Sequence, residues 1–318
     1  MKTVKDKSIK MEANKMDWKK KIDDVHFKHL NNIQQSNPTD VVYHYCSPTG
    51  LIGILTSQTL WLSDSDYLND ASESYYFYDI FQKALQFDLG APTNRRASHF
   101  IFESFFLSYL HKEEYEQKRM NARREREFRH VLSLSTDKDN VSLWNYYTKT
   151  PGNIGYTIGF QTSELINSIY TEDEIVHGKV IYDKAKQQSL LAELLLDYWQ
   201  EYKQLKYTYQ RKYLYEKLEH NLVIYSVFMK DPCFSSENEY RVALISVDLV
   251  NMRQNRKFRE LNGSFVPYIA QPIDIKSIQE IGISPTHKAD FAKKSVIELF
   301  ESKNIQISAY NSEIPLRY

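Results

Sequence analysis

The chain has 318 residues, of which 26% are charged and 14% aromatic, and its 41 Lys and Arg are balanced by 41 Asp and Glu. This balance gives no overall electrostatic attraction to nucleic acid or to an anionic membrane, and two cysteines provide neither a disulfide framework nor a CxxC metal site. No apolar run approaches the roughly 18 residues of a membrane span, and the polar N-terminus does not resemble a signal peptide, so we expect a cytoplasmic protein without membrane association.

The first part of the chain alternates helices and strands. Residues 1–16 are polar and are expected to be disordered or loosely attached, and residues 16–35 have the apolar spacing of an amphipathic helix. The β-branched and aromatic content of residues 41–46 predicts a strand. A short helix at 48–55, a strand at 59–63, a helix at 72–85 and further helix at 98–129 follow.

The second part of the chain is richer in strands. Strands are predicted at 131–135, 154–160 and 175–182, followed by a helical block at 183–217 and a helix at 222–230. After a strand at 238–246, the pattern predicts β structure at 264–270 and 275–284, a helix at 286–301 and a strand at 305–310. This order favours an α+β fold over a doubly wound one. We expect an N-terminal polar segment and helix at 1–40, then one domain at 41–318 with helical insertions near 72–129 and 183–230.

The stretch Ser235 to Leu244 is a polar loop that leads into an apolar strand. Because side chains alternate along a strand, Glu237, Glu239 and Arg241 are expected on one face and Tyr240, Val242 and Leu244 on the other. The charged face is either a polar site supported by packing or a solvated face with a Glu–Arg pair, which is the more common arrangement.

Common catalytic signatures are missing from the sequence. GxGxxG, GxxxxGK[ST], HExxH and GxSxG do not occur, so the Rossmann, P-loop, zincin and α/β-hydrolase interpretations have no signature. The histidine to single out is His44, which lies mid-strand between Tyr43 and Tyr45. Ser47 and Pro48 then supply a helix N-cap and a first-turn proline. A lone histidine on a strand is more often structural than functional.

The segment Tyr43-His44-Tyr45-Cys46-Ser47, with the helix at 51–55 and the strand at 60–63, resembles the opening of the DNA-targeting ADP-ribosyltransferase toxins. In those toxins a Tyr-His-x-[Ser/Thr] strand end precedes a short helix and a second strand. The chain also resembles a bacterial family known as a domain of unknown function. The matching pieces are Leu68-Asn69-Asp70, Leu143-Trp144 with Tyr147, Glu237-Asn238-Glu239-Tyr240-Arg241, and Ser312 to Arg317.

The resemblance implies an ADP-ribosyltransferase-like split β-sandwich that uses NAD as the ADP-ribose donor. By position, His44 contacts the nicotinamide ribose with Ser47 nearby, Glu239 is the catalytic glutamate, and Glu237 is an accessory one. Arg241 either binds the NAD pyrophosphate or holds Glu239 in place. Further candidates for contacts with NAD are Trp61, Tyr67, Asn69, Trp144, Tyr147 and Tyr156. The toxins' downstream arginine has no evident counterpart.

The implied function is transfer of ADP-ribose to a macromolecule, either a nucleic-acid base or a protein side chain. Such an enzyme would act as a bacterial toxin or phage-defence effector, and a neutralising antitoxin would be its partner. Two alternatives stay open. One is a catalytically silent module of the same fold that binds a nucleotide or a protein. The other is a metal-dependent nuclease using Glu237, Glu239 and Asp70, although the Glu-x-Lys pairing of such sites is missing.

Overall fold

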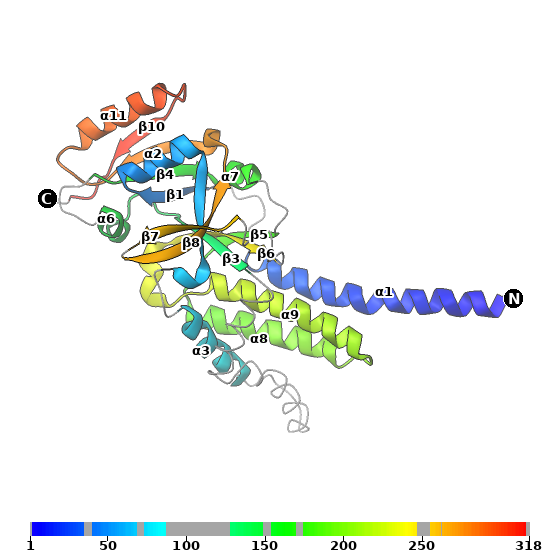
Figure 1. The fold of residues 1–318 in the computed structure, drawn as a ribbon. Coiled ribbons are helices and arrows are strands. Elements are labelled where there is room, and N and C mark those ends of the chain that lie inside the picture. Colours follow the sequence, from blue (N-terminus) through cyan, green and yellow to red (C-terminus); the bar gives the residue numbers. More distant parts are fainter. Residues whose placement is uncertain are drawn as a thin grey trace. The chain divides into compact units, whose positions relative to one another are not determined.

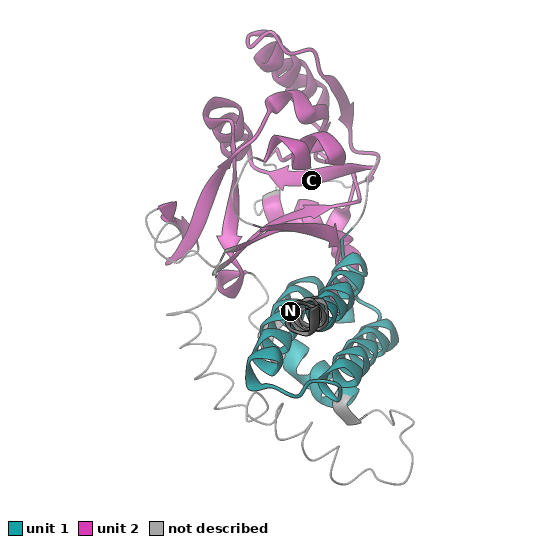
Figure 2. Ribbon diagram, turned by 90° about the vertical axis from the view of Figure 1, so that its right-hand side faces the viewer, with its two compact units in different colours: residues 1–34, 72–125, 181–232 teal, residues 35–71, 126–180, 233–318 magenta. Residues whose placement is uncertain are grey.

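The computed structural model describes residues 2–34, 40–68, 73–86, 128–148, 154–169, 174–246, 255–261 and 263–315 (Figure 1). The chain divides into two compact units, each built from three separate segments (Figure 2). Unit 1 comprises residues 1–34, 72–125 and 181–232, and unit 2 comprises residues 35–71, 126–180 and 233–318. The helical insertions expected from the sequence therefore contribute to unit 1. The single domain expected at 41–318 stays a prediction, and the helix expected at 98–129 lies outside the described residues apart from its last two positions, which belong to a strand.

Unit 1 is helical. Its described helices are α1 (Lys2–Asn31), α3 (Glu73–Gln86), α8 (Lys184–Tyr202) and α9 (Thr208–Phe228). Residues 2–16, which were expected to be disordered or loosely attached, are helical, because α1 already begins at Lys2. That segment is rich in Lys, Glu, Met and Ala, which favour helix, and it contains neither Pro nor Gly to interrupt one.

The predicted helical block at 183–217 breaks earlier than expected, between α8 and α9. The Gln210 side-chain oxygen accepts hydrogen bonds from the backbone N–H groups of Lys206 and Tyr207, both at 3.1 Å, and so caps the start of α9. The buried side chain of Leu205 anchors the connection. Since α9 then runs without a break to Phe228, the separate helix predicted at 222–230 is its second half.

Unit 2 contains a large mixed sheet. Its described strands are β1 (Val41–Cys46), β2 (Thr59–Asp64), β3 (Phe128–Ser135), β4 (Tyr156–Gln161), β5 (Glu174–Lys179), β6 (Glu239–Ser246), β7 (Lys257–Leu261), β8 (Ser264–Pro272), β9 (Ile278–Ile283) and β10 (Ser308–Asn311). The described strand pairs are antiparallel except for β9 with β10, which is parallel. The predicted combination of helices with a sheet is confirmed, whereas β7 was not predicted.

The sheet forks at β3. One edge of β3 pairs with β6 along its whole length, from Phe128 opposite Ser246 to Ser135 opposite Glu239. The other edge is shared: β2 pairs with its first half, at His130 and Val131, and β1 pairs with its end, at Ser135. In the described part of the chain, no strand therefore pairs with this edge between those two places. One arm of the fork continues through β1, β4, β9 and β10, and the other through β2, β8 and β7.

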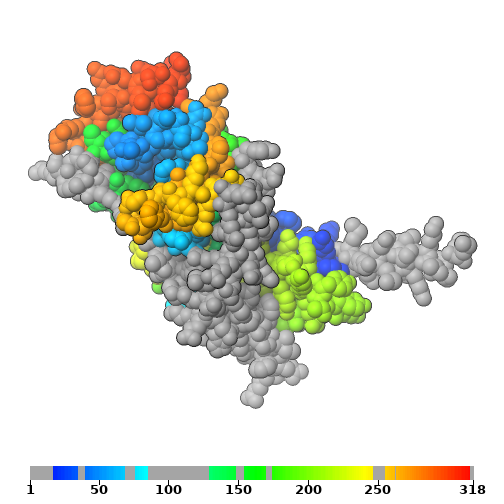
Figure 3. Space-filling view, viewed as in Figure 1, coloured from blue at the N-terminus to red at the C-terminus, as the bar shows by residue number. Residues whose placement is uncertain are grey.

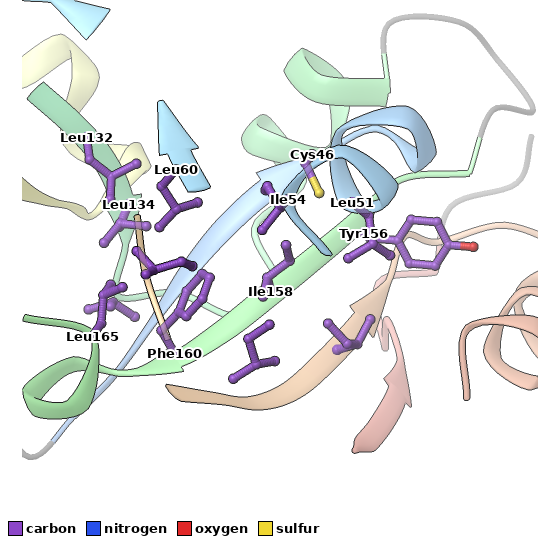
Figure 4. Close-up of a cluster of buried hydrophobic side chains, with 14 of the residues drawn as sticks. Cys46, Leu51, Ile54, Leu60, Leu132, Leu134, Tyr156, Ile158, Phe160 and Leu165 are labelled. Atoms are coloured by element: carbon purple, nitrogen blue, oxygen red, sulfur yellow. The ribbon is translucent and has the colours of Figure 1, made fainter. Parts of the chain in front are cut away.

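Both arms contribute to one hydrophobic core. Figure 4 shows Leu132 and Leu134 of β3 near Phe160 of β4, with Ile158 further along β4. The helices α2 (Pro48–Ser57) and α11 (Ala289–Glu301) add Leu51 and other apolar side chains to this core. The removal of these side chains from water is the main source of stability for the forked arrangement.

Candidate active site at the fork of the sheet

The start of β6 presents two buried charges. Glu239 and Arg241 are only 6% and 1% exposed, and the Arg241 Nη2 atom lies 3.0 Å from the Glu239 Oε2 atom. Tyr240, Val242 and Leu244 enter the core cluster, as the strand alternation predicts. The charged face is therefore not a solvated one, and the interpretation as a polar site supported by packing is the one that agrees with the burial.

Glu237 does not lie on the strand, so the prediction that it shares the strand face of Glu239 and Arg241 is wrong. Glu237 ends a short 3₁₀ helix, η2 (Pro232–Glu237), and β6 begins only at Glu239. Between them Asn238 has a φ of 46°, which is the left-handed region that asparagine tolerates. The end of β3 fixes this turn, because Ser135 Oγ donates to the Glu237 carbonyl at 2.7 Å and the Thr136 N–H donates to the Asn238 carbonyl at 2.8 Å.

His44 occupies the fork itself. Strand alternation alone would turn it toward the core with Val42 and Cys46, but β1 leaves β3 at this point. The half-buried imidazole instead hydrogen-bonds with the backbone of Ser133, the residue at the middle of the unpaired edge. Desolvation, and to a smaller extent the positive charge of Arg259, lower the pKa of His44 to about 4. The imidazole is therefore neutral at pH 7 and acts as a hydrogen-bonding group rather than a cation.

Tyr147 interacts electrostatically with several ionisable groups near the fork. It lies on α6 (Val141–Thr148), half-buried, with its ring 6.3 Å from that of Tyr45. Desolvation raises the pKa of Tyr147, the charges of Glu239 and Glu237 raise it further, and the charge of Arg259 lowers it. Because electrostatic interaction falls off with distance, Tyr147 is within electrostatic range of all three charges.

The strand register gives the separation between β1 and the start of β6. Tyr43 on β1 is opposite Ser135 on β3, which is in turn opposite Glu239 on β6. Neighbouring strands lie about 4.8 Å apart, so β1 and the start of β6 are separated by about 10 Å. The space between these two strands is occupied by β3 itself, at Ser135.

Arg259 on β7 is a candidate site residue that the sequence analysis missed. Its Nη2 atom donates to Ser63 Oγ at 2.8 Å, and its guanidinium carbon lies 5.7 Å from the centre of the Trp61 ring. Trp61 in turn stacks on Tyr268, with ring centres 4.4 Å apart. Desolvation lowers the pKa of Arg259, and the groups that raise it are tyrosines rather than carboxylates. Within the described ranges no Asp or Glu pairs with it, so this half-buried cation is suited to binding an anion.

A weak signal for Arg259 exists in the sequence. Lys257 to Leu261 is a short segment with charged residues at three of its five positions, and Gly263 follows it with a φ of 80°. A glycine with positive φ is typical of a hairpin turn between two strands. The strand was not predicted from the sequence, because the segment is mostly charged and lacks the β-branched residues that mark the other strands.

Two of the predicted aromatic candidates are buried among other side chains, Trp144 against Tyr45 and Tyr156 in the core. Trp144 is 1% exposed, and its Nε1 atom donates to Asp139 Oδ1 at 2.7 Å. Tyr156 belongs to the hydrophobic core (Figure 4), and its hydroxyl hydrogen-bonds with Ser295. Both positions are typical of structural residues.

The remaining candidates lie at the surface or outside the described residues. Ser47 is exposed and caps α2, accepting a hydrogen bond from the Gly50 N–H at 3.1 Å. Tyr67 is 46% exposed in a single 3₁₀ turn at Ser65–Tyr67. Trp61 is 44% exposed beside Arg259. Asn69, like Asp70 of the nuclease alternative, lies outside the described residues.

The described part of the chain contains neither a group of metal ligands nor a helix that could span a membrane. Among those residues no three His, Cys, Asp or Glu side chains are grouped as metal ligands. No helix among them is both long and apolar enough to cross a bilayer.

A family model described as a protein of unknown function (DUF2971) matches residues 143–242. The matched region contains Tyr147, Glu237, Glu239 and Arg241 but neither His44 nor Arg259, and its description gives no activity. A search of curated proteins found no match to the chain. A search of solved structures found none either.

Proposed function

We propose that the fork in unit 2 is the active site of a NAD-dependent ADP-ribosyltransferase that modifies a macromolecular acceptor. The observation that carries the proposal is that Tyr147 interacts electrostatically with Glu239, Glu237 and Arg259, and that Arg259 also interacts with the neutral His44. Side chains from both arms of the sheet take part, although they are far apart in sequence. Shifted pKa values, here those of Tyr147, His44 and Arg259, are typical of groups at functional sites.

The forked sheet supports the split β-sandwich that the sequence resemblance implies. A split sandwich needs two strand layers that share a core and separate at one place. Here β1 and β3 are joined by one residue pair, and both arms add side chains to one core. The imidazole that the resemblance assigns to the nicotinamide ribose lies at the point of separation.

The groups at the fork suit the chemistry of ADP-ribosyl transfer. When the bond between the nicotinamide nitrogen and the ribose C1′ breaks, nicotinamide leaves with the bonding electron pair and positive charge develops on the ribose. The Glu239 carboxylate stabilises that charge selectively in the transition state. The acceptor then forms a bond to C1′ and gives its proton to Glu237. Of the two roles considered for Arg241, the ion pair favours the one in which it positions Glu239.

The donor's phosphates need a cation, and Arg259 is the best candidate in the described ranges. Its guanidinium matches phosphate oxygens in fork geometry, and it has no carboxylate partner in those ranges. Trp61 and Tyr147 offer aromatic faces near it, which would pack against the nicotinamide or adenine ring. The residues present therefore fit NAD.

Labelled NAD tests this proposal. We expect the wild-type protein, incubated with NAD labelled in its ADP-ribose and with a bacterial cell extract, to transfer label to protein or nucleic acid. The Glu239→Gln variant should transfer label at least roughly 100-fold more slowly than the wild type, because it lacks the stabilising charge. Glu298→Gln, on an exposed position of α11, is the matched control and should label like the wild type.

Three other outcomes would argue against the proposal. Equal labelling by wild type and Glu239→Gln would remove the catalytic assignment. Binding of NAD without release of nicotinamide would favour the catalytically silent module. Cleavage of nucleic acid that a chelator abolishes and that needs no NAD would favour the nuclease.

A further inference from the structure

The connection between α8 and α9 has an unusual composition for this chain. Residues 202–215, here called the α8–α9 tip, read Tyr-Lys-Gln-Leu-Lys-Tyr-Thr-Tyr-Gln-Arg-Lys-Tyr-Leu-Tyr. The tip contains five tyrosines and four cations and has no Asp or Glu, whereas the charges of the whole chain balance. It is the yellow-green end of the α8–α9 hairpin in Figure 3. The tip is therefore a locally basic and aromatic segment, bordered by Glu201 and Glu216, in a neutral protein.

Two tyrosine rings of the tip are exposed and stacked. Tyr207 and Tyr209 are 59% and 53% exposed, their ring centres are 5.7 Å apart, and their ring planes are nearly parallel, at 11°. Trp18 of α1 meets the Tyr209 ring edge-on at 5.8 Å. Large aromatic faces that stay in water at a fixed orientation are a common feature of binding surfaces.

A second ring stack lies beside the hairpin connection. Trp199 stacks on Tyr202 with ring centres 5.5 Å apart, and Tyr202 stacks on Tyr215 at 6.0 Å. The Arg211 guanidinium lies 4.9 Å from the centre of the Tyr202 ring. Because Arg211 also donates to the Leu205 carbonyl at 3.3 Å, this stack is fixed to the backbone of the connection. The rings are thus held in place before any ligand arrives.

Exposed lysines surround these rings. Lys203 and Lys206 are exposed and make no ion pair with another described residue. Lys212 reaches Glu216 only at 4.0 Å, with both side chains largely in solvent. On the α1 side, the Lys19 Nζ atom lies 5.1 Å from the centre of the Tyr213 ring. Cations interleaved with rings are the arrangement that tracks a phosphate backbone while bases stack.

We propose that the α8–α9 tip binds single-stranded nucleic acid. The lysines contact phosphates, and unpaired bases stack on Tyr207 and Tyr209. A duplex hides its base faces, so it would use the lysines alone and bind more weakly. An anionic membrane is the less suitable partner, because the exposed large side chains of the tip are tyrosines and no aliphatic residue is available there to insert. This site is in unit 1 and does not rest on the proposed activity of unit 2.

Fluorescence anisotropy with a labelled oligo(dT) of about 20 nucleotides tests the site on the full chain. We expect binding that weakens between about 50 and 200 mM KCl. Tyr207→Ala with Tyr209→Ala should weaken binding about tenfold for each ring removed. Tyr207→Phe with Tyr209→Phe keeps the rings and should bind like the wild type. Lys203→Glu with Lys206→Glu should reduce the slope of log affinity against log salt by roughly 1.4 or more.

Matched substitutions outside the tip complete the experiment. Phe291→Ala removes a 73% exposed ring from α11, and Lys276→Glu with Lys288→Glu reverses two exposed charges of unit 2. These variants should bind oligo(dT) like the wild type. The proposal fails if the tip variants, folded by circular dichroism, bind as tightly as the wild type. It also fails if vesicles with anionic lipid, but not oligo(dT), bind to the tip.

Discussion

Arg241 and Glu239 form an ion pair that is almost completely removed from water. Moving two charges out of water is costly, and their mutual attraction offsets that cost only while both are present. We therefore expect Arg241→Met to lower the free energy of unfolding by roughly 3–5 kcal/mol, because it leaves the Glu239 carboxylate buried without the guanidinium. Urea denaturation followed by circular dichroism measures the change.

The double variant Glu239→Gln with Arg241→Met separates the ion pair from the packing around it. Since both charges are then gone, we expect it to recover a large part of the loss. Lys294→Met is the control, because it removes one partner of an exposed pair with Glu298 and should change stability by less than about 1 kcal/mol. A cost for Arg241→Met as small as that of the control would contradict the account of a buried pair.

At the scale of elements, one backbone conformation sets how Glu237 and Glu239 are arranged. Asn238 joins η2 to β6 with a φ of 46°. A β-branched residue is strained in that region by about 1–2 kcal/mol, whereas glycine is not. We expect Asn238→Gly to retain ADP-ribosyl transfer and Asn238→Val to reduce both stability and transfer, because the turn then moves Glu237.

Asn304, which follows α11 with a φ of 59°, is the matched control for that experiment. Asn304→Val introduces the same kind of strain away from the fork, so we expect it to lower the unfolding midpoint but to leave the rate of label transfer unchanged. Loss of transfer in both valine variants would mean that the effect of Asn238→Val is one of general stability.

The elements also show what the sequence can and cannot predict. The strand at 41–46 was predictable, and so was the placement of Glu239 and Arg241 on the opposite strand face from Tyr240. Both follow from alternation of apolar residues, which is a local signal. β7 and its Arg259 were not, since a charged edge hairpin has no such signal. The position of Glu237 depends on one asparagine conformation that no periodicity reports. The fork depends on which strands share an edge of β3, and this is a property of long-range pairing.

At the scale of the whole molecule, the net charge of the chain does not indicate the charge of a local surface. The balance of 41 cations and 41 anions argues against a long nucleic-acid footprint. The α8–α9 tip nevertheless collects four cations without a carboxylate. A short patch can bind single strands because stacking supplies affinity that needs no charge. The relevant quantity is therefore the charge of each surface rather than that of the chain.

The region matched by the family model is not a folding unit, because its elements have their partners elsewhere in the chain. In the full chain β6 forms eight residue pairs with β3, and β4 pairs with β1 and β9. All three of these partner strands lie outside residues 143–242. Because residue 242 lies halfway along β6, only the pairs of His177, Gly178 and Lys179 with Val242, Arg241 and Tyr240 remain between β5 and β6, and two isolated strands are marginally stable in water. The helices α8 and α9 lose α1 and α3, which pack against them in unit 1.

We therefore expect the isolated segment 143–242 to show helical far-UV circular dichroism without a near-UV signal or a cooperative thermal transition. The full chain, measured under the same conditions, should show both of the features that the segment lacks. Protein concentration is varied as a control, because association could bury the freed strand edges. A sharp melting transition of the monomeric segment, with a near-UV spectrum, would show that the contacts made by β1, β3, β9 and α1 are dispensable. In that case the fork could not be the feature that holds the site together, since β4 is the only strand of its two arms that the segment contains.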